Sequence, residues 1–387
     1  MKLFSLIYGV MADLIVAYLP SPKVKDKFAF IVHPRSTYDA VNKFFFLKFL
    51  PKPIANFFLR HLWPITATKI EGLKYLETGK SIEGWILGVP LTPRQMIENR
   101  TLAKKRILQA VKLAEKKGAR IVGLGGLTGS LTEGGTYIVN NNKKVDITTG
   151  RSYTAYTVTE NLFKLAGYFD INLADGKFAI VGGGGSIGLA CAEMLVRAGI
   201  NNLLLVDLIG RKENMEKIIK QLKQDDRDNI LNITFSHQIH DIINSDIVIA
   251  ATNAPEAVIK SEDLKPGAIV IDDAQPSDVD KAVIKERDDV LIIEGGVIRA
   301  DNIKYRMNMG LAGRNDIFSC LAEVLAIAAH GENGHYTVGW LDLNLIDEIS
   351  KLGIALDFKL APFQNKYGYI TEEKMQKIRK IIRNKPA

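Results

Sequence analysis

The chain has 387 residues, of which 47% are hydrophobic and 24% are charged, and its formal net charge is +8. This length predicts two or three domains with ample cores, and the composition excludes a disordered or repetitive protein. The two cysteines, Cys191 and Cys320, are too few for a disulfide framework and suit a reducing compartment, so we expect a cytoplasmic protein. The positive charge favours acidic partners, such as an anionic membrane or an acidic protein.

The apolar segment at residues 3–19 predicts a helix that is buried or lies at a membrane interface. Asp13 interrupts it, it is shorter than the ~20 residues of a spanning helix, and no A-x-A-like site follows, so we expect neither a membrane span nor a signal peptide.

Residues 40–70 contain no acidic residue and mix basic with aromatic side chains. This pattern suits a surface that lies on anionic lipid or guides an apolar substrate, and equally a pair of aromatic core helices. No nucleic-acid recognition motif accompanies the charge, so we expect no nucleic-acid partner. The side chains in question are Lys43, Lys48, Lys52, Arg60 and Lys69, with Phe44, Phe45, Phe46, Phe49, Phe57 and Phe58.

Three apolar runs, at 28–33, 84–89 and 120–123, predict strands of an N-terminal α/β domain that spans residues 1–154. The segment 101–117 predicts an amphipathic helix, which Gly118 would end. Two later segments, 123–135 and 148–156, are rich in glycine and hydroxyl groups and predict site loops, of which the second opens a helix.

Four consecutive glycines follow an apolar strand pattern at 178–181 and precede a helical pattern at 189–198. Such a loop lets the chain turn tightly, approach a pyrophosphate, and pack the helix on the strand, with the anion at the helix N-terminus. Two spacings fit, one from Gly183 and one from Gly182, so the roles of individual glycines stay open. The predicted dinucleotide-binding residues in this loop are Gly182, Gly183, Gly185, Ser186, Ile187 and Gly188.

The next strand pattern, 203–206, ends in Asp207, about 20 residues after the glycines, where a carboxylate can accept the ribose 2′-hydroxyl. Asp207 favours NADH, and nearby Arg211 leaves NADPH open. Further strand patterns alternate with helices, which predicts a doubly wound parallel Rossmann sheet in a domain over residues 155–300. We also assign Thr252, Gly295 and Gly296 to the cofactor site.

Residues 301–387 predict a helical C-terminal segment that carries Cys320. Asn315 or Asp316 predicts an N-cap that places Cys320 in the first helical turn, where the helix dipole favours a thiolate. By residue type alone, both Cys320 and Cys191 are more typical of small core residues. The basic tail from Thr371 predicts a solvated helix.

Several short motifs in one order resemble the long-chain acyl-[acyl-carrier-protein] reductases that form fatty aldehydes. The resemblance covers residues 120–361 and departs from the family at Tyr153, where a histidine is expected, and at Asp273, which replaces a glycine. The matching segments are 124–128, 148–150 with 154–156, 182–188, 270–272, 295–297, 318–323, and 335–337 with Gly339.

The resemblance implies that Cys320 attacks an acyl thioester and carries the acyl group, and that hydride from NADPH or NADH then yields the aldehyde. It implies an acyl-carrier protein as partner. We also expect no metal site. Candidate oxyanion donors are Thr128, Ser130, the Gly125–Gly126 loop and the N-terminus of the helix that carries Cys320, and Tyr156 or His335 would supply a proton. Two alternatives remain open: a dehydrogenase of small amino, hydroxy or keto acids without a covalent intermediate, and a dinucleotide-binding protein without activity.

Overall fold

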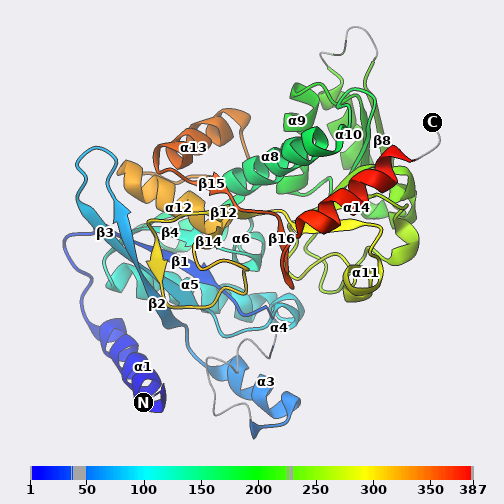
Figure 1. Cartoon of the computed structure of the whole chain (residues 1–387). Coiled ribbons are helices and arrows are strands. Elements are labelled where there is room, and N and C mark those ends of the chain that lie inside the picture. The colour runs from blue at the N-terminus through cyan, green and yellow to red at the C-terminus, as the bar shows by residue number, and fades with distance from the viewer. Residues whose placement is uncertain (1, 36, 38–48, 225, 227–229, 385–387) are drawn as a thin grey trace.

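The computed structural model describes residues 2–35, 37, 49–224, 226 and 230–384, and it contains two α/β domains that lie side by side (Figure 1). The N-terminal sheet has the order β13-β2-β3-β1-β4-β5. Its central strands β3, β1, β4 and β5 are parallel, whereas β2 runs antiparallel to both β3 and β13. The strands are β1 (Lys27–Val32), β2 (Ile65–Lys74), β3 (Ser81–Gly88), β4 (Ala119–Leu124), β5 (Asp146–Thr148) and β13 (Lys304–Tyr305).

Alternation along β1 divides the core of this domain between the two faces of the sheet. Ala29 and Ile31 belong to a core cluster with α5 (Arg100–Lys116), whereas Phe28 and Phe30 belong to a cluster with α12 (Ser319–His330). The predicted strands at β1, β3 and β4 and the predicted helix at α5 are confirmed. The shorter helices here are α4 (Pro93–Glu98), α6 (Leu127–Ser130) and α7 (Thr136–Asn141).

The second sheet has the order β11-β10-β9-β6-β7-β8, and all its neighbours are parallel. The order reverses beside β6, as in a Rossmann sheet, so the predicted fold class is confirmed. Its strands are β6 (Lys177–Val181), β7 (Asn202–Val206), β8 (Asn232–Ser236), β9 (Ile247–Ala250), β10 (Ile269–Asp272) and β11 (Leu291–Glu294). Around it lie α9 (Ser186–Arg197), α10 (Lys212–Leu222), α11 (Lys281–Glu286), and the 3₁₀ helices η2 (Ile209–Arg211), η3 (Ile239–Asn244) and η4 (Ser261–Asp263).

The helix α8 (Arg151–Phe169) joins the two domains, since it packs against α9 of the second domain and against α12. The chain after residue 300 is distributed over both domains: α12 covers the first sheet, while α13 (Leu343–Ala355) contacts α8 and α12. Short strands complete this region: β12 (Val297–Arg299), β14 (Asp316–Phe318) and β15 (Lys359–Leu360) form one sheet, and β16 (Gln364–Asn365) pairs with β17 (Gly368–Tyr369).

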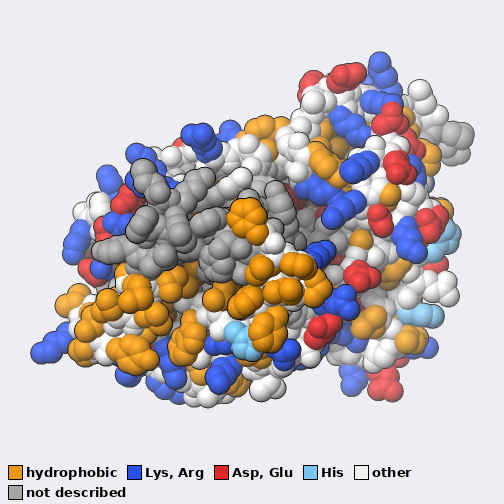
Figure 2. All heavy atoms as spheres, turned by 90° about the horizontal axis from the view of Figure 1, so that it is seen from below, with side chains coloured by type: hydrophobic (Ala, Val, Ile, Leu, Met, Phe, Trp, Pro, Cys, Tyr) orange, Lys and Arg blue, Asp and Glu red, His pale blue; other side chains and the backbone are white. Residues whose placement is uncertain are grey.

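The apolar N-terminal segment forms α1 (Lys2–Tyr18), as predicted, and α3 (Lys52–His61) lies on the same side of the molecule (Figure 1). Figure 2, which views this side, shows many hydrophobic side chains at the surface. In the part of the chain that the structure describes, no helix is both long and apolar enough to cross a membrane. Lys43, Lys48 and Phe44, Phe45 and Phe46 lie outside the described residues.

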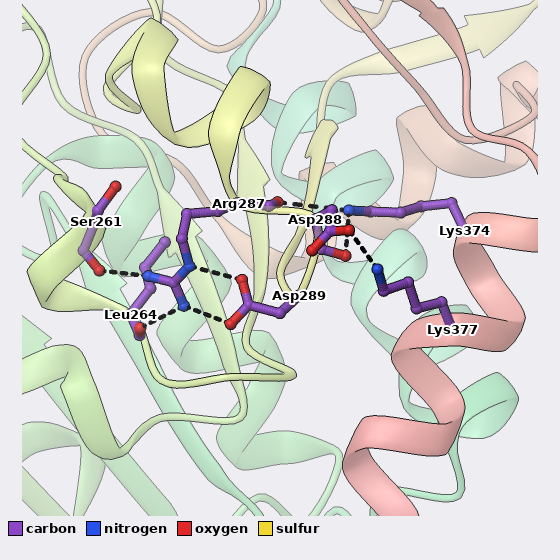
Figure 3. A network of polar contacts seen from close by, with 7 residues as sticks. All are labelled: Ser261, Leu264, Arg287, Asp288, Asp289, Lys374 and Lys377. Atoms are coloured by element: carbon purple, nitrogen blue, oxygen red, sulfur yellow. Dashed lines mark hydrogen bonds and ion pairs between the residues drawn. The ribbon is translucent and has the colours of Figure 1, made fainter.

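The C-terminal helix α14 (Glu372–Arg383) is anchored to the second domain by the loop before β11 (Figure 3). The Lys374 ammonium donates to the carbonyl of Asp288 at 2.8 Å, and Lys377 pairs with the Asp288 carboxylate. Arg287 stabilises the same loop through an ion pair with Asp289. The predicted C-terminal helix is present, with one face buried at Met375 and Ile378 and the other face at solvent.

Candidate active site

Cys320 is the second residue of α12 and therefore lies in the first helical turn, as predicted. The predicted cap was wrong, because Phe318 is the N-cap residue and makes no side-chain cap. Asp316 instead lies in β14, where its buried carboxylate accepts hydrogen bonds from Arg299 at 3.1 Å and from Gln364 at 2.9 Å. Because its carboxylate is bound by these two side chains, Asp316 does not cap the N-terminus of α12.

The surroundings of Cys320 hold its thiol in the neutral form. Burial, together with the nearby carboxyl groups of Asp273 and Glu323, raises the pKa of Cys320 to about 12. The backbone N–H groups of Gly126 and Leu321 act in the opposite direction without reversing the shift. The expectation that the helix N-terminus favours a standing thiolate was therefore wrong, and a nucleophilic Cys320 needs a base when it reacts.

Gly150 shapes the space beside Cys320. Its φ is +74°, and a Cβ added there would lie 2.3 Å from the Cβ and 2.5 Å from the Cα of Cys320. Both the left-handed backbone and the close approach require glycine. The loop after β5, predicted as a site loop, thus packs directly on the candidate nucleophile.

Glu323, one turn after Cys320, ties together the segments around it. Its buried carboxylate accepts hydrogen bonds from the hydroxyls of Thr148 and Thr337 and from the backbone N–H groups of Gly150 and Tyr153, the last two at 3.0 and 2.9 Å. Sequence reasoning missed this residue, although a lone acid in the apolar run after Cys320 was a signal. Buried carboxylates with several donors fix local geometry strongly.

Arg151 connects the same segments from the other side. Its guanidinium donates to the hydroxyl of Thr149 at 2.8 Å and to the carbonyls of Thr337 and Gly339 at 2.8 and 2.7 Å. Sequence motifs that are almost 200 residues apart, before α8 and after α12, therefore meet beside Cys320.

The candidate oxyanion donors lie on the loop after β4 and on α6. The Thr128 hydroxyl is buried and donates to the Gly125 carbonyl at 2.8 Å, so it is already engaged. Ser130 is exposed, and its hydroxyl lies 3.4 Å from the amide oxygen of Asn253 in the second domain. Gly126 is exposed as well, and its backbone N–H is directed at the Cys320 thiol. Of these groups, the Gly126 N–H is the donor nearest to the chemistry.

His33 supports this loop and was missed from the sequence. Its Nε2 accepts a hydrogen bond from the Leu127 N–H at 3.1 Å, and its Nδ1 lies 3.0 Å from the Pro34 carbonyl. Burial lowers the pKa of His33, which favours the neutral ring with a proton on Nδ1. A neutral histidine satisfies both contacts and holds the turn at Gly126, whose Cβ position would lie 2.8 Å from Nε2.

The two predicted proton donors lie in different settings. Tyr156, on α8, packs against the cores of both domains, and burial together with Glu160 raises its pKa. His335 is exposed in the segment after α12, beside the edge strand β5, where its Nδ1 accepts a hydrogen bond from the Ile147 N–H at 3.2 Å. Within the described residues, neither side chain hydrogen-bonds to Cys320. Their roles stay predictions.

The glycine loop has two positions where only glycine fits. Gly182 has φ of +87°, and a Cβ there would lie 2.7 Å from the Ala251 carbonyl oxygen. A Cβ on Gly188 would lie 2.3 Å from the Gly182 carbonyl oxygen, so this residue lets α9 pack on the turn. A Cβ on Gly183 would come no closer than 3.1 Å to its nearest neighbour, the Leu205 side chain, which favours the spacing that starts at Gly182.

The start of α9 fits a dinucleotide pyrophosphate. Gly185 is its N-cap residue and provides no side chain, so the backbone N–H groups of Ser186 and Ile187 have no side-chain cap. Asp207 lies at the end of β7, where its carboxylate accepts from the Gly184 N–H at 2.8 Å. The Arg211 guanidinium donates to the Gly184 carbonyl at 3.0 Å, so a carboxylate and a cation both adjoin the loop.

Gly295 and Gly296 connect the second sheet to the start of α12. The Gly296 carbonyl accepts from the Ser319 N–H at 2.9 Å, and a Cβ on Gly296 would lie 2.3 Å from Oδ1 of Asp273. The Gly295 carbonyl accepts from the Asn161 side chain at 2.8 Å. The carboxyl edge of the nucleotide sheet therefore adjoins the residue before Cys320.

Thr252, after β9, hydrogen-bonds to Asp278, which belongs to a group of acidic residues that follows β10. Its backbone N–H donates to the Asp278 carboxylate at 2.9 Å, and its hydroxyl bonds to the same group. Burial raises the pKa of Asp278 to about 7. Because the Thr252 hydroxyl is already bonded, we expect Thr252 to line the cofactor site without donating a hydrogen bond from its hydroxyl to the cofactor.

Asp273 is the most unusual group in this region. Burial, together with the nearby carboxyl groups of Asp272, Asp278 and Glu294, raises the pKa of Asp273 well above its usual range. Among the residues that the structure describes, its carboxyl has no hydrogen bond or ion pair. The Asp273 carboxyl group raises the pKa of Cys320 through its charge, so the two side chains lie near each other at the domain junction. Strongly perturbed acids of this kind are typical of functional sites.

Comparisons with known proteins agree with the dinucleotide-binding part. Residues 165–294 match the family model described as shikimate/quinate 5-dehydrogenase, which is about a third of the chain. The chain is 29% identical over 295 residues to an aminotransferase PigE from Serratia sp., with 75% of this chain covered but only 34% of that protein. It is 24% identical over 277 residues to a long-chain acyl-[acyl-carrier-protein] reductase from Synechococcus elongatus, which covers 68% of this chain and 77% of that enzyme.

Among solved structures, a malic enzyme from Entamoeba histolytica aligns with a TM-score of 0.40 and 11% identity, covering 97% of this chain and 76% of the other. A similarity this low adds no argument about activity. The glycine loop, the parallel sheet and the dehydrogenase model agree on one point. The chain contains an NAD(P)-binding Rossmann domain of the dehydrogenase type.

Proposed function

We propose that this protein reduces long-chain acyl thioesters to fatty aldehydes with NADH or NADPH, through an acyl group carried on Cys320. The observation that supports this most is the position of Cys320, between the Gly126 N–H and the Gly296 segment at the edge of the nucleotide sheet. The similarity to an acyl-[acyl-carrier-protein] reductase, though distant, agrees with this choice of substrate.

Because the thiol is neutral at rest, the reaction begins with a proton transfer. Asp273, in its ionised form, takes the proton of the Cys320 thiol as the sulfur attacks the thioester carbonyl carbon. The Gly126 N–H is placed to stabilise the oxyanion that forms. When the carbonyl re-forms, the bond to the carrier sulfur breaks, and neutral Asp273 returns the proton to the departing thiolate, which leaves Cys320 acylated.

The Gly182–Gly188 loop, Asp207 and Arg211 would hold the nicotinamide nucleotide, which would supply the hydride that reduces the acyl carbon. The reduced carbon then forms a carbonyl as its bond to the Cys320 sulfur breaks. The aldehyde leaves, and the Cys320 thiolate takes up one proton from solvent, which restores the neutral thiol. Arg151 and Glu323 keep the surrounding loops fixed throughout.

A turnover assay with paired cysteine variants tests this proposal. Oxidation of NADPH or NADH with an acyl thioester is expected to fall at least ~10³-fold in Cys320→Ser, because a hydroxyl is a far weaker nucleophile under the same conditions. Cys191→Ser is the matched control, since Cys191 is buried inside α9 and should have no part in catalysis. Full activity of Cys320→Ser would refute the covalent route.

A second candidate is a dehydrogenase that transfers hydride directly to or from a small amino, hydroxy or keto acid. Two observations favour it: the match of residues 165–294 to a shikimate/quinate 5-dehydrogenase model, and the raised pKa of Cys320. In this case Cys320 would act as a packing residue, and Cys320→Ser would oxidise or reduce small acids as fast as the parent protein.

A further inference from the structure

The helix α1 turns one face to the protein and an apolar face to solvent. Val10 and Val16 pack against core clusters, and the buried Asp13 accepts hydrogen bonds from the Thr66 N–H and hydroxyl at 2.6 and 2.7 Å. These contacts fix the helix on the first domain. The opposite stripe remains exposed, at Met11, Leu14, Ile15, Tyr18 and the following Leu19.

The helix α3 has the same inverted pattern. Ala55 and Leu59 are buried, whereas Ile54, Phe57 and Phe58 are 45%, 61% and 46% exposed. The exposed residues recur at helical spacing, so they form one stripe. A globular helix normally turns such a stripe inward, and a large exposed apolar surface indicates an interaction site.

The two stripes belong to one side of the molecule. Val10 of α1 packs against the cluster of Ala55 and Leu59 under α3, and Figure 2 shows hydrophobic side chains gathered over this side. Trp63, just after α3, is 53% exposed and lies 5.9 Å from the Arg106 guanidinium, ring centroid to carbon. We call the exposed residues of these two stripes, with Trp63, the α1–α3 face.

The exposed charges on the two helices themselves have one sign in the part of the chain that the structure describes. Asp13 is the sole acidic residue in the sequences of α1 and α3, and its carboxylate is buried and paired with Lys117 at 3.0 Å. Lys52 and Arg60 of α3 are exposed. An apolar face with exposed cations and aromatic residues, and without exposed acids, matches the surface of an anionic bilayer.

We propose that the α1–α3 face docks on the surface of an anionic phospholipid membrane. A second copy of the chain fits less well, because a symmetric contact would bring Lys52 and Arg60 of both copies together. An acidic protein also fits less well, since the exposed apolar side chains outnumber these cations. The inference does not depend on the proposed reaction, because it uses no residue of the active site.

Co-sedimentation with vesicles, without substrate or cofactor, tests the proposal on the full chain. The parent protein should bind vesicles of phosphatidylcholine with phosphatidylglycerol, and bind vesicles of phosphatidylcholine alone more weakly. Phe57→Ser with Phe58→Ser should weaken binding at least ~10-fold, because two large side chains no longer insert. Lys52→Glu with Arg60→Glu should weaken binding to the anionic vesicles only.

Trp340→Ser with Ile354→Ser is the matched control, since these side chains are 73% and 62% exposed and lie outside the α1–α3 face. Circular dichroism should show that every variant is folded, as all the changed side chains are exposed. Three results would overturn the proposal: no binding by the parent, undiminished binding by the phenylalanine variant, or a parent dimer in light scattering that the same variant disrupts.

Discussion

Replacing Glu323 with glutamine tests how the active-site loops are held. The carboxylate accepts four hydrogen bonds: Oε1 takes those from Thr148, Thr337 and the Gly150 N–H, and Oε2 takes that from the Tyr153 N–H. An amide has one acceptor oxygen, so in either orientation its NH₂ group faces one of the two backbone N–H donors. One buried N–H is then unpaired, which lowers the free energy of unfolding by ~1–3 kcal/mol, and the remaining hydrogen bonds no longer have a charged acceptor.

We therefore expect Glu323→Gln to lower the free energy of unfolding by ~3 kcal/mol, measured by urea denaturation and circular dichroism. Glu332→Gln is the control, because the Glu332 side chain is 67% exposed, and its change should stay within ~0.5 kcal/mol. Loss of the charge should also lower the pKa of Cys320 and speed its alkylation at fixed pH. Unchanged stability together with unchanged alkylation would refute this reasoning.

Three further changes probe the nucleophile, the nucleotide and the acid cluster. Gly150→Ala should lower the free energy of unfolding by at least ~2 kcal/mol and slow turnover, because it strains the backbone and displaces Cys320. Gly167 has open space around it, so Gly167→Ala should leave the free energy of unfolding unchanged or raise it. In binding titrations, Asp207→Ala should weaken the binding of NADH ~10-fold more than the binding of NADPH. A parent protein that strongly prefers NADPH would contradict this role of Asp207. Asp273→Asn should be as stable as the parent below about pH 4 and increasingly more stable as pH rises, because the raised pKa of Asp273 makes its ionised form unfavourable in the folded state. Denaturation series over pH check the last point, and a constant difference would contradict it.

The sequence predicts the frame of the molecule well because its strands are buried on both faces. The runs at β6, β7, β9, β10 and β11 are nearly all apolar, and such runs identify parallel strands. The strand β2 escaped prediction because its pairing with β3 shifts register twice, which breaks the alternation that reveals a half-buried strand.

The site was only partly predictable for a related reason. Cys320, Asp207 and the glycine loop stand in local patterns, and the structure places them where those patterns suggest. The roles of Glu323 and Arg151 depend on partners that lie 170 and 188 residues away in the sequence, which no local pattern contains. The state of the Cys320 thiol depends on burial and on Asp273, so the helix position alone gave the wrong direction.

The most direct test of the central claim is the mass of the intact protein after incubation with a long-chain acyl thioester in the absence of nicotinamide. We expect the mass to rise by one acyl group, with the adduct on Cys320, present in Cys191→Ser and absent from Cys320→Ser. Addition of NADPH or NADH should then remove the adduct and release aldehyde. A parent protein that turns over acyl thioesters yet never carries an acyl group on Cys320 would contradict the account.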